Sequence, residues 1–501
     1  MLFIHPPVAK PCEPPAGIAQ LAGALASHNI PCSVSDMNIE SIYYLISQAN
    51  SHPDTWTKRA TKNRKRNIAS LRSSELYSNT AKYNKTVLEL NRLVEIQGGR
   101  KTTPSFANYH DTRLSPLKSS DLLKITEQPE LCLYYPFLVE QLQKLLRKEK
   151  TEHIGISLNY LSQAFTSFAL IGIIKKYSPA SKIILGGGLV TSWMRGYTWN
   201  NPFDGLVDHC IDGCGEAPLL AIFGQQKQSE ALPDYDSFPL QKYFAPGFIL
   251  PYSSSSGCFW NKCSFCPERA EKNIFLPKSA EKVLAELDVL IEKYNPVLIQ
   301  FLDTAIPPAI LKHLAAKELS VPWYGFARIT EHLLNLDFCR DLKKSGCVML
   351  KLGIESGDQG VLDKMEKGLD LVHISAALKN LKAAGISTYV YLLFGTPEET
   401  IEGAYKTLEF TKAHHREIDF LNLAIFNMPI NSGEKGSIKT STFYEGDLSL
   451  YTDFVHPHGW NRKEVRLFLD RQFKRQPEIA SILRRDPQIF TSNHAPFFCK
   501  G

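Results

Sequence analysis

The sequence predicts an α/β protein with two parallel-sheet domains, and three observations lead to that prediction. Short apolar runs alternate with segments of helical periodicity in two series, one near the N-terminus and one in the middle of the chain. Such alternation is typical of parallel strands joined by helical crossovers. A long charged stretch interrupts the first series, and the pattern changes again beyond Gly433. We therefore expect a doubly wound (Rossmann/flavodoxin-like) domain with a helical insertion, a partial (βα)6 barrel of the TIM type, and a small C-terminal helical region.

The first series of elements begins at the N-terminus. Ile18, Leu21, Ala22 and Leu25 share one face of a helix that follows two prolines. Ligands of doubly wound sheets bind beyond the carboxyl ends of the strands, and three consecutive glycines at such an end give a backbone that a large ligand can approach closely: Gly186, Gly187 and Gly188. The predicted elements of this series are the strands 2–7, 32–37, 153–158, 182–185 and 208–211 and the helix 165–177.

The predicted domain limits follow from these changes of pattern. The doubly wound domain spans residues 1–225 with its insertion at about 42–150, a polar linker spans 226–245, the barrel spans 246–436, and an extension spans 437–501. Within the insertion, Lys58–Arg66 holds six cations in nine residues. Only Trp56 offers an aromatic ring nearby, so a solvated helix face explains the run better than a nucleic-acid site.

The second series predicts the barrel. Val283, Leu284, Leu287, Leu290 and Ile291 recur at helical spacing between two apolar runs. Each predicted strand leads into small or charged residues, as expected where barrel enzymes place their chemistry. The predicted elements are the strands 248–253, 297–303, 323–328, 348–357 and 388–394, the helices 280–294 and 374–384, and a basic amphipathic helix 463–485 in the extension.

Three cysteines lie on the loop that leaves the first barrel strand. Cys258, Cys263 and Cys266 are separated by gaps of four and two residues. Three thiolates hold three irons of a [4Fe-4S] cluster and leave the fourth iron open to a substrate. A structural zinc site is the alternative, but it requires four ligands, and Cys339 and Cys347 are distant in the sequence. The pattern therefore favours a cluster over zinc.

The cysteine loop resembles the cluster loop of the radical S-adenosylmethionine (SAM) superfamily, which usually has three residues in the first gap and an aromatic residue before the last cysteine. The segments Gly353–Gly357, Lys367–Gly368 and Phe394–Thr400 resemble the SAM-pocket motifs of cobalamin-dependent radical SAM enzymes. The resemblance implies a [4Fe-4S] cluster and SAM as cofactors, with the segment at Gly395 near the adenine. It implies cofactor-binding roles for Phe265, Asp303, Arg328, Glu355, Ser356, Gly395 and Pro397.

The N-terminal domain resembles the cobalamin-binding domain of the same enzymes. The resemblance rests on the order of His5-Pro6-Pro7, the triple glycine and the turn that ends at Glu216. It implies cobalamin as a cofactor, with binding roles for Gly213 and Glu216. No Asp-x-His-x-x-Gly segment supplies a histidine to cobalt, and His5 at a strand end is a poor substitute. A domain of this fold that no longer binds cobalamin is the alternative.

In this family the cluster reduces SAM to methionine and a 5′-deoxyadenosyl radical, which removes a hydrogen atom from an unactivated carbon. Methylcobalamin then commonly methylates that carbon. Three alternatives are a non-methylating rearrangement or cyclisation, a methylthiotransferase, and a non-enzymatic cobalamin- or zinc-binding regulator. A methylthiotransferase would bring a second cysteine triplet, which Cys12, Cys32 and Cys132 do not resemble.

Composition fits a large enzyme of the reducing cytoplasm. The chain has 501 residues, a net charge of +6 and 11 cysteines, without a leader or a long apolar run that could span a membrane. We expect an unidentified small-molecule or peptide substrate and an external one-electron reductant such as flavodoxin or ferredoxin. The candidates for shaping the substrate pocket are in the extension: His456, His458, Trp460 and His494.

Overall fold

The computed structural model describes residues 1–49, 54–148, 151–196, 199–226, 231–436, 438–488 and 497. The chain divides into two compact units. The first comprises Met1–Phe248 and Tyr444–Leu450, and the second comprises Ile249–Phe443 and Tyr451–Pro487. The described residues of the segment 226–245, which the sequence predicts to be a linker, therefore belong to the first unit.

The first unit contains a five-stranded sheet in the order β2-β1-β5-β6-β7, in which all neighbours are parallel. Leu2 of β1 pairs with Ser33 of β2 on one side and with Ile154 of β5 on the other. This order confirms the doubly wound fold of the flavodoxin-like kind. The strands are β1 (Leu2–His5), β2 (Ser33–Asp36), β5 (His153–Ser157), β6 (Lys182–Gly186) and β7 (His209–Cys210).

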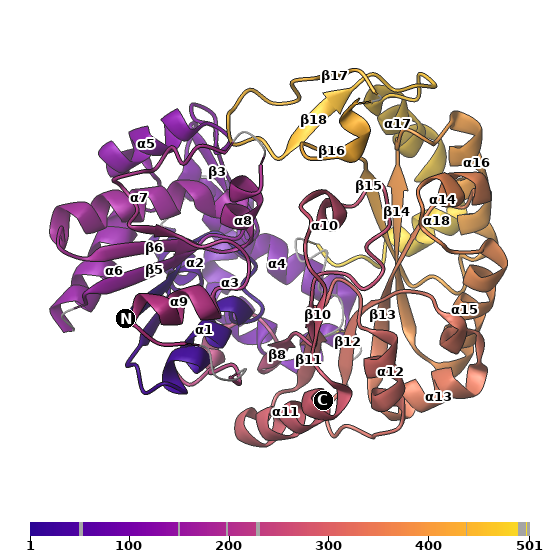
Figure 1. The fold of residues 1–501 in the computed structure, drawn as a ribbon, viewed down its shortest axis with the longest axis horizontal. Helices are drawn as coiled ribbons and strands as arrows, with labels where there is room; N and C mark the ends of the chain where they lie inside the picture. The colour runs from indigo at the N-terminus through magenta and orange to yellow at the C-terminus, as the bar shows by residue number, and fades with distance from the viewer. Residues whose placement is uncertain are drawn as a thin grey trace. The chain divides into compact units, whose positions relative to one another are not determined.

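Helices lie along the sheet of this unit (Figure 1). In α1 (Ala16–Ala26), Ile18 and Leu25 are fully buried, as the helical spacing predicts. Asp36 ends β2 and accepts hydrogen bonds from the backbone N–H groups of Asn38 and Ile39, so it caps the next helix. The other helices on this sheet are α2 (Met37–Gln48), α7 (Leu161–Tyr177), α8 (Gly188–Met194) and α9 (Glu216–Ile222).

The insertion is helical, but it also contains a β-hairpin that the sequence analysis did not anticipate. Thr102 of the first strand pairs with Asp111 of the second in antiparallel register. The hairpin was missed because each strand has only three residues, too few to show alternation. The elements of the insertion are α3 (Thr55–Leu71), α4 (Thr80–Glu95), β3 (Thr102–Pro104), β4 (Tyr109–Asp111), α5 (Ser119–Glu127) and α6 (Tyr135–Lys148).

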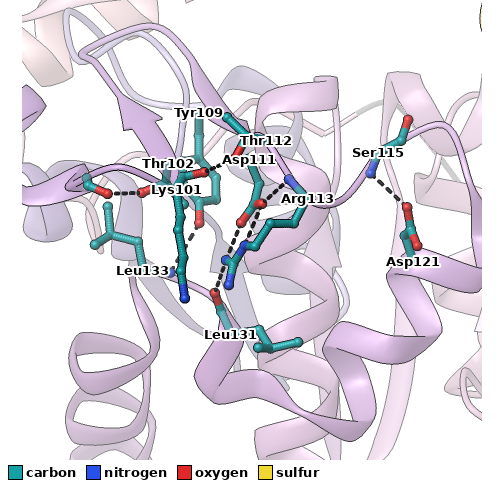
Figure 2. A network of polar contacts seen from close by, with 11 residues as sticks. Lys101, Thr102, Tyr109, Asp111, Thr112, Arg113, Ser115, Asp121, Leu131 and Leu133 are labelled. Carbon is teal, nitrogen blue, oxygen red and sulfur yellow. Dashed lines mark hydrogen bonds and ion pairs between the residues drawn. The ribbon is translucent and has the colours of Figure 1, made fainter.

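A polar network anchors this hairpin (Figure 2). The Arg113 guanidinium donates to both carboxylate oxygens of buried Asp111, at 3.0 and 2.6 Å, and also to the carbonyl oxygen of Leu131 at 3.3 Å. The backbone N–H of Leu133 donates to the Tyr109 hydroxyl at 3.1 Å. These bonds join residues of the insertion to one another, so the network stabilises the hairpin.

The basic run of the insertion lies on α3, which packs against α4. Arg59 forms an ion pair of 2.8 Å with Glu89, and Asn63 and Asn67 donate to the same carboxylate. Arg64 donates to the carbonyl oxygen of Ile46. Part of the cationic run therefore serves helix packing inside the unit.

The second unit contains a six-stranded sheet in the order β15-β14-β13-β12-β11-β8, again with only parallel neighbours. This confirms the partial (βα)6 barrel. The sixth strand, β15, was not located from the sequence. The strands are β8 (Ile249–Tyr252), β11 (Leu298–Phe301), β12 (Trp323–Ala327), β13 (Cys347–Glu355), β14 (Ser387–Phe394) and β15 (Phe420–Ile425).

Helices connect these strands, and Figure 1 shows α13, α15 and α16 along one side of β13 and β14. The helix predicted at 280–294 is α11, with those limits. The helix predicted from residue 374 begins earlier, where Asp370 accepts a hydrogen bond from the N–H of Val372. The helices are α11 (Ala280–Tyr294), α12 (Pro308–Ala315), α13 (Leu336–Lys344), α14 (Gln359–Lys364), α15 (Leu371–Ala384) and α16 (Ile401–Ala413).

The extension differs from the prediction of one helix over 463–485, which is wrong. The structure has α17 (Arg462–Phe468), a π-helical turn over Leu469–Phe473, and α18 (Pro477–Leu483). The break has a physical cause, because Pro477 lacks an N–H and starts a new helix at its first position. The preceding segment forms a small sheet of β16 (Met428–Pro429), β18 (Tyr451–Phe454) and β17 (Thr440–Ser441). The candidate His494 lies outside the described residues.

Two properties of the described part of the chain bear on the protein's environment. No helix there combines the length and the apolar character that crossing a membrane requires. Every described cysteine is a free thiol.

Candidate active site

A short ladder closes the base of the cysteine loop. Ser255–Ser256 (β9), which follow β8, pair antiparallel with Leu276–Pro277 (β10). Gly257 sits at the turn with φ +71°, and a Cβ there would lie 2.5 Å from the Ile274 carbonyl oxygen. Only glycine fits this position. The two ends of the cysteine loop are therefore paired with each other, and the loop lies at the carboxyl end of β8, the first barrel strand.

The three cysteines are neighbours on this loop. Cys263 is buried, whereas Cys258 and Cys266 are half-buried, and the N–H of Cys266 donates to the Cys263 carbonyl oxygen at 3.3 Å. Burial raises the pKa of Cys263, against the opposing effect of Lys367 and Arg328, and raises the pKa of Cys266 to about 11. Both groups are therefore protonated thiols at neutral pH unless a metal displaces the proton.

Neither Cys339 nor Cys347 lies where it could serve as a fourth ligand beside the cysteine loop. Among the described residues, no three His, Cys, Asp or Glu side chains converge closely enough to hold one metal ion. The cysteines of a [4Fe-4S] cluster each bind a different iron, so they need no common point. Cys347 begins β13 and therefore lies at the opposite end of the parallel sheet from this loop, and Cys339 is buried on α13 with its thiol directed at the Leu333 carbonyl oxygen.

The longer first gap of the loop is accommodated by a left-handed residue and an indole anchor. Asn261 has φ +44°, a conformation that asparagine tolerates better than most residues. The Trp260 indole N–H donates to the Glu366 carbonyl oxygen at 3.0 Å, and the Arg328 guanidinium stacks 3.9 Å from the ring centroid. A Cβ at Gly368 would overlap the Trp260 ring. These contacts fix the loop against the segment that follows α14.

Cations surround the loop. Lys367 forms a buried ion pair of 2.8 Å with Glu355 and lies 5.5 Å from the Phe265 ring centroid. The Arg328 guanidinium donates to the carbonyl oxygens of Lys367 and Gly368 and also contacts the Cys263 thiol. The structure thus brings four predicted positions together: Phe265, Arg328, Glu355 and the Lys367–Gly368 pair.

Glu355 has an unusual backbone. It ends β13 at φ +70°, where the register with β14 shifts between Gly353 and Glu355. Such a bulge re-aims a side chain at the rim of a sheet. A non-glycine residue at positive φ is costly and persists where the surroundings demand it. The bulge directs the Glu355 carboxylate toward Lys367.

Two residues predicted to bind a cofactor, Asp303 and Ser356, form hydrogen bonds within the protein. The Asp303 carboxylate is buried and accepts hydrogen bonds from the Ser254 N–H, the Ser254 hydroxyl and the Ser255 hydroxyl at 3.1, 2.7 and 2.5 Å. The Ser356 hydroxyl is buried beside the Thr407 hydroxyl at 3.1 Å. In this structure, Asp303 fixes the root of the cysteine loop and Ser356 fixes the strand end to α16.

Sequence reasoning missed Glu399, which organises the loop after β14. This carboxylate accepts the Gly395 N–H at 2.6 Å and the Trp460 indole N–H at 2.7 Å, and burial raises its pKa to about 7. His456 contacts the Thr396 carbonyl oxygen at 2.8 Å. Trp460 and His456 therefore tie the extension to the Gly395 segment, where Pro397 is also buried. In the sequence, Glu399 is one residue of the segment Phe394–Thr400, and nothing there indicates that its side chain is buried.

A cavity of about 250 Å³ opens beside this loop. Gly395, with φ +79°, forms one wall. The remaining lining comes from the residues after β15 and from the extension: Ile425, Phe426, Asn427, Met428, Phe443, Thr452, Asp453, Phe454, His456, Trp460, Asn461, Arg462 and Lys463. His458 does not line this cavity among the described residues, although its ring lies near His456.

In the first unit, the predicted glycines lie at the carboxyl edge of the sheet. Gly187 has φ +112°, and a Cβ there would lie 2.5 Å from the Leu158 carbonyl oxygen. Gly186 ends β6 and Gly188 begins α8. The Gly213 N–H donates to the Thr191 hydroxyl, and Glu216 begins α9. Three successive glycines and Gly213 thus lie at this edge, next to the side chains of Asn159 and Arg195.

Comparisons with known proteins agree with this geometry. The family model of the Radical SAM superfamily matches residues 252–411. An uncharacterized methyltransferase of Pyrococcus horikoshii, PH0819, is 29% identical over 204 residues, which are 39% of this chain and 43% of that protein. The anaerobic magnesium-protoporphyrin IX monomethyl ester cyclase of Rubrivivax gelatinosus is 24% identical over 264 residues, 48% of this chain and 45% of that protein. The chain thus spans less than half the length of each of these relatives.

Solved structures share the fold. The radical SAM methyltransferase TsrM of Kitasatospora setae has a TM-score of 0.57 at 12% identity, with 96% of this chain and 89% of that chain covered. The cobalamin-dependent radical SAM enzyme OxsB has a TM-score of 0.50 at 17% identity, with 66% and 60% covered. Residues 252–411 therefore belong to the radical SAM superfamily. The chain shares its fold with TsrM over 96% of its length and with OxsB over 66%.

Proposed function

We propose that this protein is a radical SAM enzyme that reductively cleaves SAM at a [4Fe-4S] cluster and uses cobalamin to methylate an unactivated carbon of its substrate. One observation carries the proposal. Cys258, Cys263 and Cys266 lie together on a loop at the carboxyl end of the first strand of a six-stranded parallel barrel, within the segment that matches the superfamily. Chemistry at that end of the strands is the rule for barrel enzymes.

The residues of the loop fit a cluster with one open iron. Three thiols are available, and two cations face the loop, half-buried Arg328 and buried Lys367. A cluster with three thiolate ligands is anionic, so these cations would favour the bound state. The cluster would supply the electron that breaks the sulfonium bond of SAM. The chain's contribution is to hold the cofactors in register and to exclude water from them.

SAM has a charged amino-acid end and a flat adenine, and the barrel offers a place for each. The Glu355 carboxylate at the rim of β13 is suited to the amino group. The cavity beside Gly395 has a glycine wall and aromatic rings that suit the adenine. Since Asp303 and Ser356 are engaged within the protein, we assign them supporting roles in which they position the loops that touch SAM.

Cobalamin suits the first unit because three successive glycines, Gly186 to Gly188, lie at the carboxyl edge of its sheet, where a large flat ligand would approach the backbone. Gly187 could not carry a Cβ without a shift of the neighbouring strand end. Ligands of doubly wound sheets bind at this edge. The corrin would supply the methyl-carrying cobalt, and TsrM and OxsB, which share this fold, are solved with cobalamin.

A non-methylating ring closure is the second candidate, because one of the two relatives is a cyclase. Both reactions begin with the same 5′-deoxyadenosyl radical. They differ in whether a methyl group reaches the product.

We propose that the reaction takes place in the cytoplasm, where the described cysteines remain reduced and a flavodoxin or ferredoxin supplies the electron.

The test is mass spectrometry of products after anaerobic incubation of the iron- and sulfide-reconstituted protein with SAM, a strong reductant and hydroxocobalamin. Wild-type protein should form 5′-deoxyadenosine, and Cys266→Ala should not. Cys339→Ala is the matched control, because Cys339 is a buried thiol away from the loop and should keep the activity. S-adenosylhomocysteine indicates methyl transfer, whereas its absence alongside 5′-deoxyadenosine favours the cyclase alternative. A pure protein that holds zinc and no cluster contradicts the proposal.

A further inference from the structure

The sheet order of the first unit locates the place where its ligand meets the protein. In doubly wound sheets the binding crevice lies beyond the carboxyl ends of the two strands at which the strand order reverses. In the order β2-β1-β5-β6-β7 these strands are β1 and β5, which end at His5 and Ser157. The residues that directly follow His5 and Ser157 therefore face the ligand.

These two strand ends differ in what they present. After β1 the chain turns inward, since His5 is only 5% exposed and Val8 is 1% exposed, and the Gln163 side-chain amide donates to the Pro6 carbonyl oxygen at 2.8 Å. After β5 the chain presents Tyr160, which is 57% exposed. No other large apolar side chain in the described part of residues 1–248 is as exposed. Tyr160 is thus the side chain that this edge offers to a ligand.

The backbone around Tyr160 is fixed. The side-chain oxygen of Gln163, which is fully buried, accepts the N–H groups of Asn159 and Tyr160 at 2.9 and 3.2 Å. The side-chain oxygen of Asn159 accepts the N–H of Gly188 at 3.0 Å, which joins the loop to the three successive glycines after β6. An exposed ring on so well anchored a loop, beside these glycines, is a platform for a flat ligand.

We propose that Tyr160 lies against the face of the corrin that is turned toward the sheet and occupies the lower axial side of the cobalt. The inference rests on the proposed function. The sheet covers one face of a corrin that lies on its carboxyl edge, so the methyl group must leave from the opposite face. A phenol is neutral at pH 7 and is a weak metal ligand. Tyr160 therefore shields the cobalt from water without supplying a nitrogen ligand.

The test places a nitrogen where the phenol stands. Tyr160→His is loaded with cobinamide, a corrin that carries no nucleotide base of its own, and is reduced to the cobalt(II) state. Because an imidazole at this position reaches the lower face, its electron paramagnetic resonance lines should each show nitrogen superhyperfine splitting. Wild-type protein should show none. Tyr177→His is the control, since Tyr177 is also exposed but ends the same helix α7 at its far end.

A second pair of variants tests whether the Tyr160 ring packs against the corrin, independently of any bond to cobalt. Tyr160→Phe should retain the cobinamide affinity, and Tyr160→Ala should lower it about 10-fold through lost ring contact. Bound cobinamide with no splitting in Tyr160→His and unchanged affinity in Tyr160→Ala overturns the inference and leaves the proposed function standing. Wild-type protein that binds neither cobinamide nor hydroxocobalamin overturns the use of cobalamin and this inference together. Formation of 5′-deoxyadenosine separately reports on the barrel.

Discussion

Two carboxylate–cation pairs of this protein have opposite surroundings. In the insertion, Asp111 and Arg113 are two residues apart, form a two-point contact, and place their remaining bonds on backbone groups (Figure 2). In the barrel, Glu355 and Lys367 are joined across 2.8 Å, Glu355 has φ +70°, and Lys367 faces a thiol and an aromatic ring. The first pair completes a local structure. In the second pair, the Glu355 backbone has a conformation that costs free energy, and the pair lies beside the cysteine loop.

The comparison predicts different losses when each cation is removed, and this is the largest effect we expect. Lys367→Met leaves the Glu355 carboxylate buried without its partner beside the cluster loop. Formation of 5′-deoxyadenosine per mole of cluster should fall at least about 100-fold, which corresponds to about 2.7 kcal/mol of transition-state stabilisation. Arg113→Met should lower the free energy of unfolding by about 2 kcal/mol with the activity of the folded protein unchanged. Equal activity losses in both variants would break the comparison.

Glu399 adds a third carboxylate to the comparison, one without a cation. Burial raises its pKa to about 7, so between its unfolded pKa and pH 7 the folded protein binds more protons than the unfolded chain. Its contribution to stability is therefore fully present at low pH and is lost as the pH rises toward 7. Glu399→Gln keeps an oxygen for Gly395 and Trp460 but cannot ionise.

Thermal unfolding at pH 5 and pH 8 measures this difference. The stability of Glu399→Gln relative to wild type should increase on the order of 3 kcal/mol between the two pH values. Asp111→Asn should show no such gain, because Asp111 is paired with Arg113. A pH-independent difference for Glu399→Gln would mean that Glu399 ionises normally.

Two glycines extend the comparison to the backbone. Both have φ near +60°, but a Cβ at Gly99 of the insertion meets open space, whereas a Cβ at Gly368 would overlap the Trp260 ring. Gly99→Ala should cost about 1–3 kcal/mol from the backbone conformation alone, because φ +62° with ψ −136° lies outside the left-handed helical region. Gly368→Ala should cost about 2–3 kcal/mol in denaturant unfolding and should also lower the iron content after reconstitution, because Trp260 anchors the loop. Unchanged iron content would remove Trp260 from this role.

The smallest effect concerns two single hydrogen bonds. Trp460→Phe removes the indole N–H from the Glu399 carboxylate, and Tyr109→Phe removes the acceptor of the Leu133 N–H. Each should cost about 1 kcal/mol in unfolding experiments. Trp460→Phe should also raise the pKa of Glu399 further, because the indole stabilises the ionised form. A pH dependence of stability that matches wild type would contradict that link.

Much of the fold was predictable because its signals are local. Apolar runs and helical spacing located five of the six barrel strands and the strand series of the first unit, and α11 has its predicted limits. The β3–β4 hairpin was not predictable, since its strands have three residues each. Pro477 indicates that the extension divides into α17 and α18. The prediction of one helix was wrong because the apolar residues keep helical spacing on both sides of this proline.

The candidate site shows a similar limit. The cysteine spacing and motif letters pointed to the residues that the barrel brings together, and they remain predictions for cofactor contact. Burial and hydrogen-bond partners were beyond the sequence. The bonds of Asp303 to Ser254 and Ser255, and the burial of Glu399 under Trp460, depend on segments that are distant in the chain. Tyr160 was not identifiable as exposed, because an aromatic residue before a helix is commonly part of a core.

The central claim is that the cysteine loop holds a cluster with one iron open to SAM. The most direct test is electron paramagnetic resonance of the reconstituted, reduced protein before and after SAM is added. Our account predicts a [4Fe-4S] signal whose g values change on addition of SAM, and no cluster signal in Cys258→Ala. A cluster signal that SAM leaves unchanged, or a protein that takes up no iron at this loop, would contradict it.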